Sequence, residues 1–581
     1  MLEFLKTKVN YISVHKMNPY ILRETYKDED KKELEEYPEL LQELLINKGI
    51  TAKKDADIFL NPNYDEHLHD PFLMKDMDKV VDRILGAISS NEKIIIYSDY
   101  DCDGIPGGVL LHDFFKKIGY KNFENYIPHR HEEGYGLNIS AIEKFGDDKV
   151  DVLISVDCGI TDVVPVEKAN ELNIDVIITD HHLQNGVLPK AYAILNPKQE
   201  GDSYPYDMLC GTGVVFKLVQ GLIKKGDFNL KKGWEKWWLD MVGLATIADM
   251  VPLTGENRVL AHYGLQVLRK SRRPGLMQLC RKIYLKQMYI TEDDIGFMIA
   301  PRINAASRMD IPQDAFNLLS TEDEVEAGML SVHLDKINNK RKGLVGAITR
   351  EIKKRIDDSN LRDVIVMGNP DWRPPLLGIV ANNIAELYKR PTFLWGRDGG
   401  TYLKGSCRSG GTVSVMTLMS NVHKDLFIDF GGHSFSGGFS TPYEKIHELE
   451  KELLEAYSNI EKDEEESKFI DKKLSLNDVN WSTYKILERM APFGSENKKP
   501  LFLFERVRII DVKDFGKEKN HLQINFEKES GGNISAIKFF KTINDFNGKL
   551  GKGKIVDLIA TIEKSTFGRT TEIRLRIVDI V

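Results

Sequence analysis

The stretch Ile94-Ile95-Ile96-Tyr97-Ser98-Asp99-Tyr100-Asp101-Cys102-Asp103-Gly104 decides the fold of this chain. Its four apolar residues predict a short buried strand, after which three aspartates stand at alternate positions before a glycine. Because alternate side chains of an extended backbone point the same way, Asp99, Asp101 and Asp103 should lie in one small volume. Three carboxylates there repel one another unless a cation lies between them, and hard divalent ions prefer such oxygen ligands. Taken alone, the stretch also fits a polar turn after a strand or a calcium loop.

Length and composition limit the classes of function. A chain of 581 residues predicts about three to five domains, and 42% apolar with 29% charged residues is typical of soluble globular proteins. The net charge of −8 excludes a globally basic coat, so any nucleic-acid site must be a local basic channel. Five scattered cysteines without a CxxC pair argue against a disulfide frame or a zinc site. With no signal-peptide core and no apolar run of bilayer length, we expect a cytoplasmic protein.

Strands and helices then alternate along the chain. Apolar strands at residues 152–156 and 174–178 end at Asp157 and at Asp180-His181-His182, and a helix separates them. This alternation predicts an α/β fold with a doubly wound parallel sheet, whose loops after the strand carboxyl ends converge on one crevice. An apolar helix that ends at Asp249 adds a further carboxylate. Singly, each residue fits a turn, a helix cap or a hydrogen-bonded loop histidine, but together they predict a metal site.

The size of this ligand set favours two ions over one. About six carboxylate and imidazole groups exceed the needs of a single site, and their mixture suits Mn²⁺ or Mg²⁺ better than Ca²⁺ or Zn²⁺. Two such ions about 3.5–4 Å apart are the usual apparatus for phosphoester hydrolysis. The residues therefore predict a metal-dependent phosphodiesterase.

Seven further stretches carry a resemblance to a known family: residues 132–137, 193–198, 211–218, 248–253, 300–309, 403–409 and 430–433. With the acidic stretch, Asp157 and the Asp180-His181-His182 triplet, they resemble the RecJ branch of the DHH phosphoesterases, in the family's order. The resemblance implies a DHH phosphoesterase domain joined by a long helix to a second α/β, DHH-associated domain, followed by a C-terminal OB-type β-barrel. The expected limits are 76–315, 316–358, 359–460 and 467–581, after a lead-in of residues 1–75 that packs on the core.

The resemblance also implies roles for the residues at the strand ends. Two Mn²⁺ or Mg²⁺ ions would be held by six residues: Asp99, Asp101, Asp103, Asp157, His181 and Asp249. Asp157 would bridge the ions. His182, with Asp157 and Asp180, would form the catalytic group that contacts the scissile phosphate or assists proton transfer.

Ten residues are expected to contact DNA: Arg130, Arg302, Asn304, Ser307, Arg308, Lys404, Ser406, Arg408, Ser409 and His433. By the same resemblance, Ser406 and Arg408 would capture the 5′ phosphate and His433 would lie beside the scissile group. Candidates for stacking on single strands lie in the predicted barrel, although barrel aromatics are commonly core. They are Phe515, Lys517, His521, Lys538, Phe539 and Phe567.

The connector helix is predicted from its apolar periodicity. Val325, Met329 and Val332 stand at helical spacing and predict part of the face on which the helix packs. Lys336, Lys340 and Arg341 would then face the DNA cleft, although a basic helix face is also an ordinary solvated surface.

Three positions depart from the family pattern. The family commonly has glycine where this chain has Ser98, a small hydroxyl residue where it has Pro106, and histidine where it has Arg373. None of these departures removes a predicted metal ligand, so activity is still expected. They indicate a divergent member of the family, of the kind that a mobile element encodes.

We therefore expect a 5′-to-3′ exonuclease specific for single-stranded DNA that releases 5′-mononucleotides by two-metal-ion catalysis, in DNA repair and recombination. Two alternatives stay open: a DHH phosphodiesterase of short oligonucleotides, and a catalytically silent RecJ-like scaffold that binds single strands. Expected partners are single-stranded DNA with a 5′ end and a single-strand-binding protein or a helicase, with no membrane partner and a monomeric chain. The sequence leaves open the preferred ion, RNA tolerance, processivity and pathway.

Overall fold

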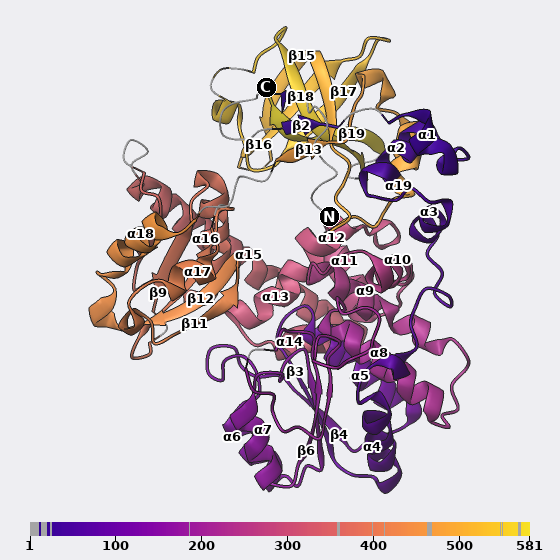
Figure 1. The fold of residues 1–581 in the computed structure, drawn as a ribbon, viewed down its shortest axis with the longest axis vertical. Helices are drawn as coiled ribbons and strands as arrows, with labels where there is room; N and C mark the ends of the chain where they lie inside the picture. Colours follow the sequence, from indigo (N-terminus) through magenta and orange to yellow (C-terminus); the bar gives the residue numbers. More distant parts are fainter. Residues whose placement is uncertain are drawn as a thin grey trace.

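The computed structural model arranges the chain as two α/β lobes and a β-barrel around a shared centre (Figure 1). It describes residues 11–12, 20–23, 26–184, 186–356, 361–397, 399–411, 413–461, 467–516, 518–546, 548, 550–566 and 571–581. Within these ranges, each helix is too short or too polar to cross a bilayer.

The first lobe is built on five parallel strands in the order β4-β3-β5-β6-β7. The strands are β3 (Ile94–Ser98), β4 (Phe123–Tyr126), β5 (Val152–Val156), β6 (Asp175–Thr179) and β7 (Ala193–Leu195). Their β-branched and aliphatic residues are buried on both faces, as parallel sheets require.

Helices cover both faces of this sheet. The face that carries Ile94 and Ile96 packs on α4 (Met77–Ser90), α5 (Gly104–Ile118) and α8 (Gly211–Lys225). The face that carries Ile95 and Tyr97 packs on α6 (Ile139–Asp147) and α7 (Val163–Glu171). The predicted doubly wound sheet is therefore confirmed.

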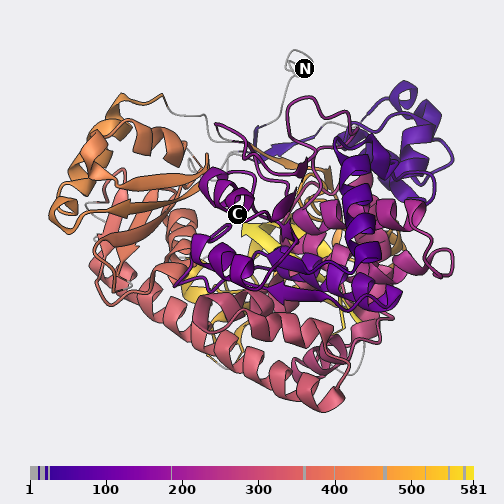
Figure 2. The same ribbon diagram turned by 90° about the horizontal axis from the view of Figure 1, so that it is seen from below.

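A helical layer extends this lobe and ends in the connector. It contains α9 (Leu239–Ala248), α10 (Gly255–Leu268), α11 (Pro274–Lys282), α12 (Glu292–Asp294), α13 (Ala300–Met309) and α14 (Gln313–Ser320). The connector is α15 (Glu324–Arg355), which Figure 2 shows along one side of the molecule, reaching from the first lobe to the second.

The packing face of α15 differs from the predicted one at its start. Val325, Met329 and Val332 are 73%, 71% and 50% exposed, whereas Ala327, Ser331 and Leu334 are buried. Helical spacing fits both stripes, and the smaller side chains of the second stripe let α15 lie close to its neighbours. The prediction for these three positions was therefore wrong.

The second lobe has a mixed sheet of order β11-β12-β10-β9-β8, in which only β8 and β9 are parallel to each other. Its strands are β8 (Ile365–Gly368), β9 (Thr392–Gly396), β10 (Leu403–Arg408), β11 (Asp429–His433) and β12 (Ser436–Thr441). Helices α16 (Pro374–Tyr388), α17 (Val415–Ser420) and α18 (Leu449–Asn459) accompany it.

The C-terminal region is a closed five-stranded barrel, which confirms the OB-type prediction. Its strands are β15 (Phe502–Phe515), β16 (His521–Glu527), β17 (Asn533–Lys538), β18 (Ile555–Ser565) and β19 (Glu572–Ile580), and pairing between β15 and β18 closes it. The N-terminal helices α2 (Glu39–Asn47) and α3 (Lys53–Leu60) contribute Leu41, Leu45 and Leu60 to the barrel core. Tyr64 and Met74 belong instead to the core of the first lobe, so this segment contacts both bodies.

Candidate metal centre and active site

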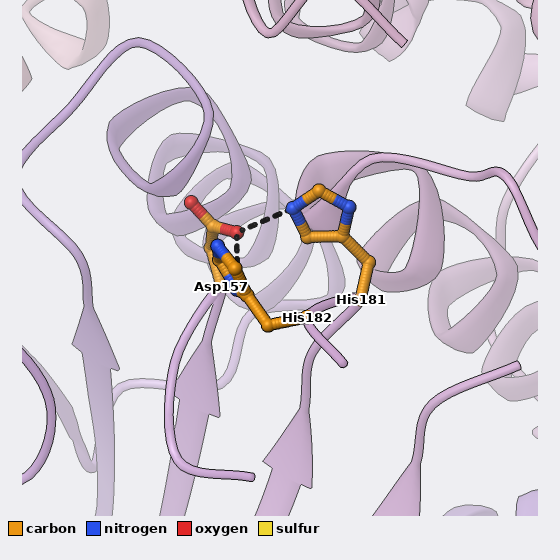
Figure 3. Close-up of side chains that lie close together, drawn as sticks. All are labelled: Asp157, His181 and His182. Carbon is orange, nitrogen blue, oxygen red and sulfur yellow. Dashed lines mark ion pairs between the residues drawn. The ribbon is translucent and has the colours of Figure 1, made fainter. Parts of the chain in front are cut away.

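The carboxyl ends of the parallel strands bring predicted ligands together. His181, after β6, places Nε2 3.2 Å from Asp157 Oδ1, after β5. The same nitrogen lies 3.7 Å from Asp103 Oδ2 and 3.7 Å from Asp249 Oδ2, at the end of α9. Figure 3 shows one carboxylate oxygen of Asp157 paired with both His181 and His182. Asp103, Asp157, His181 and Asp249, which sequence reasoning assigned to one edge of the sheet and the end of a helix, therefore lie close together.

The loop after β3 is shaped by its own aspartates. Asp101 Oδ1 accepts the backbone N–H groups of Asp103 (2.7 Å) and Gly104 (3.2 Å). A Cβ at Gly104 would lie 2.5 Å from the carbonyl oxygen of Asp99, so the close turn requires glycine. From the helical layer, Asn304 Oδ1 accepts the N–H of Cys102 at 2.8 Å. These bonds hold the acidic loop folded back on itself.

Asp103 is held by the N-terminus of α8. Its carboxylate accepts the N–H groups of Gly211 (2.6 Å) and Thr212 (2.8 Å), and the Thr212 hydroxyl donates to its carbonyl. A helix N-terminus carries partial positive charge, which stabilises the carboxylate. A Cβ at Gly211 would lie 2.6 Å from the Asp157 side chain, so glycine lets the helix approach both aspartates.

Asp157 connects the two halves of the cluster. Its φ of 62° lies in the left-handed region, which non-glycine residues adopt at a cost and mainly at functional sites. Its carboxylate groups with Asp99 and Asp101 on one side and with His181 and His182 on the other, with ligand atoms in each group within 4.8 Å of one another. A third group contains Asp103, His181 and Asp249. One carboxylate shared between groups is what a bridging ligand requires.

The charges of the acidic cluster (Asp99, Asp101, Asp103, Asp157, His181 and Asp249) fit divalent cations. Burial, with the charge of Asp101 added, raises the pKa of Asp103 to about 6. Burial and then Asp103 and Asp101 raise the pKa of Asp249 to about 8. Asp99 Oδ1 and Asp157 Oδ1 are buried and, within the described part of the chain, accept no hydrogen bond. Buried carboxylates that lie close together and accept no hydrogen bond are suited to binding hard divalent cations, which prefer oxygen ligands.

The two histidines have different charges. Burial, and then the charge of His182, lower the pKa of His181 to about 3, so His181 is a neutral imidazole able to bind a metal. Burial alone would lower the pKa of His182, but its hydrogen bond to Asp180 and the charge of that carboxylate raise the pKa to about 9. His182 is therefore a cation at neutral pH, next to the acidic cluster.

Asp180 orients these histidines rather than joining the cluster. Its Oδ1 accepts the N–H groups of His181 (2.7 Å) and His182 (3.1 Å) and lies 2.8 Å from His182 Nδ1. Its Oδ2 accepts the N–H of Ile160 at 3.0 Å. With both oxygens engaged, Asp180 is a positioning residue for His182.

Sequence reasoning did not assign a role to Tyr135. Its hydroxyl donates to the carbonyl of Asp157 at 3.1 Å and lies 3.3 Å from His182 Nδ1, while half of the residue stays exposed. Lys198 was also missed: its ammonium donates to the carbonyl of His181 at 2.6 Å. Both residues lie in stretches that carried the family resemblance, which was the only signal for them.

A cavity of about 300 Å³ lies between the two lobes, and arginine side chains from both lobes line it. Arg130 and Arg308 line it from the first lobe, and Arg408 lines it from β10 of the second. The remaining lining residues are Pro374, Pro375, Gly378, Ser406, Gly431, Gly432, His433, Ser436, Gly437 and Gly438. Three guanidinium groups, with no carboxylate among the described lining residues, suit this arginine pocket to an anion.

Arg308 joins the two lobes at this pocket. Its Nη1 donates to the carbonyl of Pro375, at the start of α16, at 2.8 Å. Burial, with Arg130 and Arg341 nearby, lowers the pKa of Arg308 to about 10, so it remains charged at neutral pH. Arg130 lies 4.7 Å over the ring of Tyr100, within the acidic loop. The pocket and the acidic cluster therefore share a wall.

Other residues expected to contact DNA lie outside the pocket. Arg302 is 7% exposed and pairs with Asp335 of α15 at 2.8 Å. Ser307 and Ser409 are buried, and Asn304 holds the acidic loop. Lys404 lies on β10, with its ammonium 5.9 Å from the ring centroid of Tyr402. The structure brings Arg130, Arg308, Ser406, Arg408 and His433 together at the pocket. The other five residues expected to contact DNA lie outside it: Arg302, Asn304, Ser307, Lys404 and Ser409.

Three of the predicted stacking residues, Phe515, His521 and Phe539, form a cluster of rings on the barrel. His521 lies 5.3 Å from Phe515, 5.0 Å from Phe539 and 5.1 Å from Phe540 between ring centroids, and Phe540 is 80% exposed. Arg576 lies 4.2 Å over the ring of Phe539. The Lys538 ammonium donates to a backbone carbonyl of β19. Lys517 and Phe567 lie outside the described residues.

Comparison with known proteins matches all three bodies. The DHH family N-terminal domain matches residues 93–246, the DHHA1 domain residues 362–459 and the RecJ OB domain residues 470–579. The crystal structure of RecJ in complex with Mn²⁺ from Thermus thermophilus superposes with a TM-score of 0.78, at 24% identity, over 95% of this chain and 77% of that one. This likeness shows that the fold is shared.

Two relatives extend the match over most of the chain. The single-stranded-DNA-specific exonuclease RecJ of Bacillus subtilis is 35% identical over 84% of this chain, which spans 62% of that protein's length. The protein of the same name from Haemophilus influenzae is 29% identical over 90% of this chain and 96% of its own length. The chain therefore carries DHH, DHHA1 and RecJ OB domains in this order, and it is similar to RecJ exonucleases over most of its length.

Proposed function

We propose that this protein is a metal-dependent 5′-to-3′ exonuclease that hydrolyses single-stranded DNA and releases 5′-mononucleotides. The observation that supports this most strongly is the pairing of an acidic cluster with an arginine pocket on opposite sides of one short loop. A phosphate held in the pocket and a phosphodiester held at the cluster are neighbours on one strand. The RecJ relatives are named single-stranded-DNA-specific exonucleases.

The acidic cluster would hold two Mn²⁺ or Mg²⁺ ions. Asp99, Asp101 and Asp157 would bind on one side, and Asp103, His181 and Asp249 on the other, with Asp157 shared. When bound, such ions polarise the phosphoryl group and make water a stronger nucleophile at neutral pH. The chain keeps the ligands in place through the α8 N-terminus on Asp103 and the backbone bonds around Asp101.

His182 and Tyr135 would act on the phosphate itself. The His182 imidazolium, oriented by Asp180, can donate a hydrogen bond to a phosphate oxygen next to the cluster. Tyr135 limits the rotation of this imidazole from its exposed side. Together they stabilise negative charge that develops on the scissile group.

The arginine pocket would set the polarity of the reaction. Arg408 and Ser406 from the second lobe, with Arg130 and Arg308 from the first, would bind the terminal 5′ phosphate through charged hydrogen bonds. Because Arg130 of the pocket lies over Tyr100 of the acidic loop, a 5′ phosphate bound there would present a nearby phosphodiester to the acidic cluster. Release of mononucleotides from the 5′ end is proposed on this basis.

We further propose that one chain suffices and that it works in the cytoplasm on strands that a helicase or a single-strand-binding protein supplies. The cluster and the pocket are complete within a single chain, which supports a monomer. All five cysteines are free and buried, which supports a reducing compartment. An enzyme restricted to single strands needs another protein to expose them.

The silent-scaffold alternative predicts degraded ligands, yet all six predicted ligands are present. The decisive experiment compares wild type with Asp101→Asn, which keeps the oxygen that accepts two N–H groups but removes the charge. Each is incubated with Mn²⁺ and 5′-phosphorylated single-stranded, blunt duplex or dinucleotide substrates. Mononucleotides released by wild type from the long single strand, and lost in the variant, support the proposal. No metal-dependent release by wild type would favour the scaffold, and release from dinucleotides alone would favour an oligonucleotide phosphodiesterase.

A further inference from the structure

Asp249 enters the acidic cluster from the C-terminal end of a helix, unlike the ligands that follow strands. It ends α9, with its N–H donating to the carbonyl of Ala245, and Met250 next to it has a left-handed φ of 60°. Irregular backbone then continues to Thr254, before α10 begins. The position of the Asp249 carboxylate therefore depends on what holds residues 250–254.

The barrel side of the molecule holds this loop. Leu253 donates its N–H to the carbonyl of Ser495 at 2.9 Å, and its side chain is buried. A Cβ at Gly494 would lie 2.8 Å from Leu253 Cδ1, so the Leu253 side chain packs closely on the Gly494 backbone. The turn that leads into the barrel is therefore packed directly on the loop that carries Asp249.

Arg258, in the first turn of α10, also binds the segment that leads into the barrel. Its Nε donates to the carbonyl of Phe59 at 2.7 Å, Nη2 to that of Ala491 at 3.1 Å and Nη1 to that of Pro492 at 3.4 Å. The guanidinium also lies 3.7 Å over the ring of Phe59. It is 3% exposed and, among the described residues, forms no ion pair. A buried cation that donates hydrogen bonds to the backbone carbonyls of two other segments holds those segments together.

The turn itself is rigid. The side chain of Asn497 donates to the carbonyls of Met490 (2.9 Å) and Pro492 (2.7 Å) and is buried. Gly494 and Asn497 bond to each other across the turn. At its other end the chain continues into β15 at Phe502. Residues 490–497, here called the strut, therefore form a hydrogen-bonded link between the barrel and the Asp249 loop.

We propose that the strut positions Asp249, and that Arg258 is a positioning residue for the metal centre. This inference rests on the proposed role of the acidic cluster as a two-cation site. The Asp249 carboxylate reaches the cluster only when the barrel is docked, so barrel placement and metal affinity are coupled. Side chains that orient metal ligands are typically worth 10–100-fold in affinity.

The test measures Mn²⁺ binding to the full chain by electron paramagnetic resonance, without substrate. Wild type should bind two ions. Arg258→Met should bind one of them about tenfold more weakly, and Arg258→Lys should restore part of the loss because an ammonium can reach some of the same carbonyls. Gly494→Ala, which presses a methyl group on Leu253, should weaken the same ion without touching Arg258.

The matched control is Lys499→Met. Lys499 pairs with Asp293 of α12, so this variant removes one ion pair near the barrel but leaves the strut contacts that hold the Asp249 loop in place. It should bind both ions like wild type. Wild-type binding by Arg258→Met and Gly494→Ala would overturn the inference, as would equal weakening in Lys499→Met. A wild type that binds no Mn²⁺ would overturn the proposed function as well, which separates the two failures.

Discussion

The acidic cluster and the arginine pocket concentrate opposite charges by different means. The cluster is assembled mostly from one sheet, whose parallel strands end at Ser98, Val156 and Thr179 and deliver their next residues to one edge. The pocket is assembled from two lobes that contact each other through Arg308 and Pro375. A site built by one sheet is fixed by local sequence, whereas a site built between lobes depends on how they dock. The difference predicts that mutations in the acidic cluster abolish hydrolysis. Mutations in the arginine pocket should instead weaken the preference for a 5′-phosphate end over a 5′-hydroxyl end.

The largest effect should come from Asp157→Asn, which removes the charge shared by both halves of the cluster. Loss of one bridging ligand forfeits several kcal/mol of charge stabilisation, so kcat/KM should fall about 10³-fold. The measurement is nucleotide release from 5′-phosphorylated single strands with Mn²⁺. Asp175→Asn, at the other end of the same sheet and paired with Arg83, is the control and should keep wild-type activity. An Asp157→Asn enzyme within tenfold of wild type would contradict the account.

Asp180→Asn should lower kcat by about 10²-fold, because His182 loses both its orientation and the charge that keeps it protonated. KM for DNA should change little, since Asp180 is buried and has no free oxygen for substrate. Steady-state kinetics on a single-stranded substrate separate these two constants. A variant with normal kcat and raised KM would show that His182 only binds DNA.

Arg408→Gln tests the other half of the comparison. A charged hydrogen bond is worth about 1.5–3 kcal/mol, so preference for a 5′-phosphate over a 5′-hydroxyl end should fall about 10–100-fold. The measured quantity is the ratio of kcat/KM for the two substrates. Arg397→Gln, in the same lobe and stacked over Tyr443, is the control. An unchanged ratio in Arg408→Gln would place 5′-phosphate recognition elsewhere.

The smallest effect should come from Tyr135→Phe. It keeps the ring against His182 but loses the hydroxyl that contacts the Asp157 carbonyl and His182 Nδ1. One neutral hydrogen bond contributes about 0.5–1.5 kcal/mol, so kcat should fall roughly three- to tenfold. Tyr135→Ala should cost more than Tyr135→Phe. Equal losses would show that the hydroxyl, not the ring, restrains His182.

The same contrast explains what could be predicted from sequence. Asp99, Asp101, Asp103, Asp157 and His181 could be predicted to lie together because a strand places the next residue at a known edge of the sheet. Arg302 was expected in the DNA cleft, but its partner Asp335 lies on another helix, and no local pattern shows such a pair. The outward position of Val325 and Met329 was missed for a related reason. Two helical stripes fit the spacing, and only the packing partners of α15 select one of them.

Tyr135 shows a further limit of sequence reasoning. It lies in a loop between β4 and α6, where side-chain direction follows from the turn and not from a repeating period. The family resemblance marked the stretch, but only coordinates place its hydroxyl beside His182. Arg258 is a similar case, because its three acceptor carbonyls come from segments far away in the chain.

The measurement that tests the central claim most directly is anomalous X-ray scattering from crystals grown with Mn²⁺. The account predicts two peaks inside the acidic cluster, one next to Asp99 and Asp101, the other next to Asp103 and Asp249, with Asp157 in contact with both. A single peak, or manganese bound away from these side chains, would contradict it.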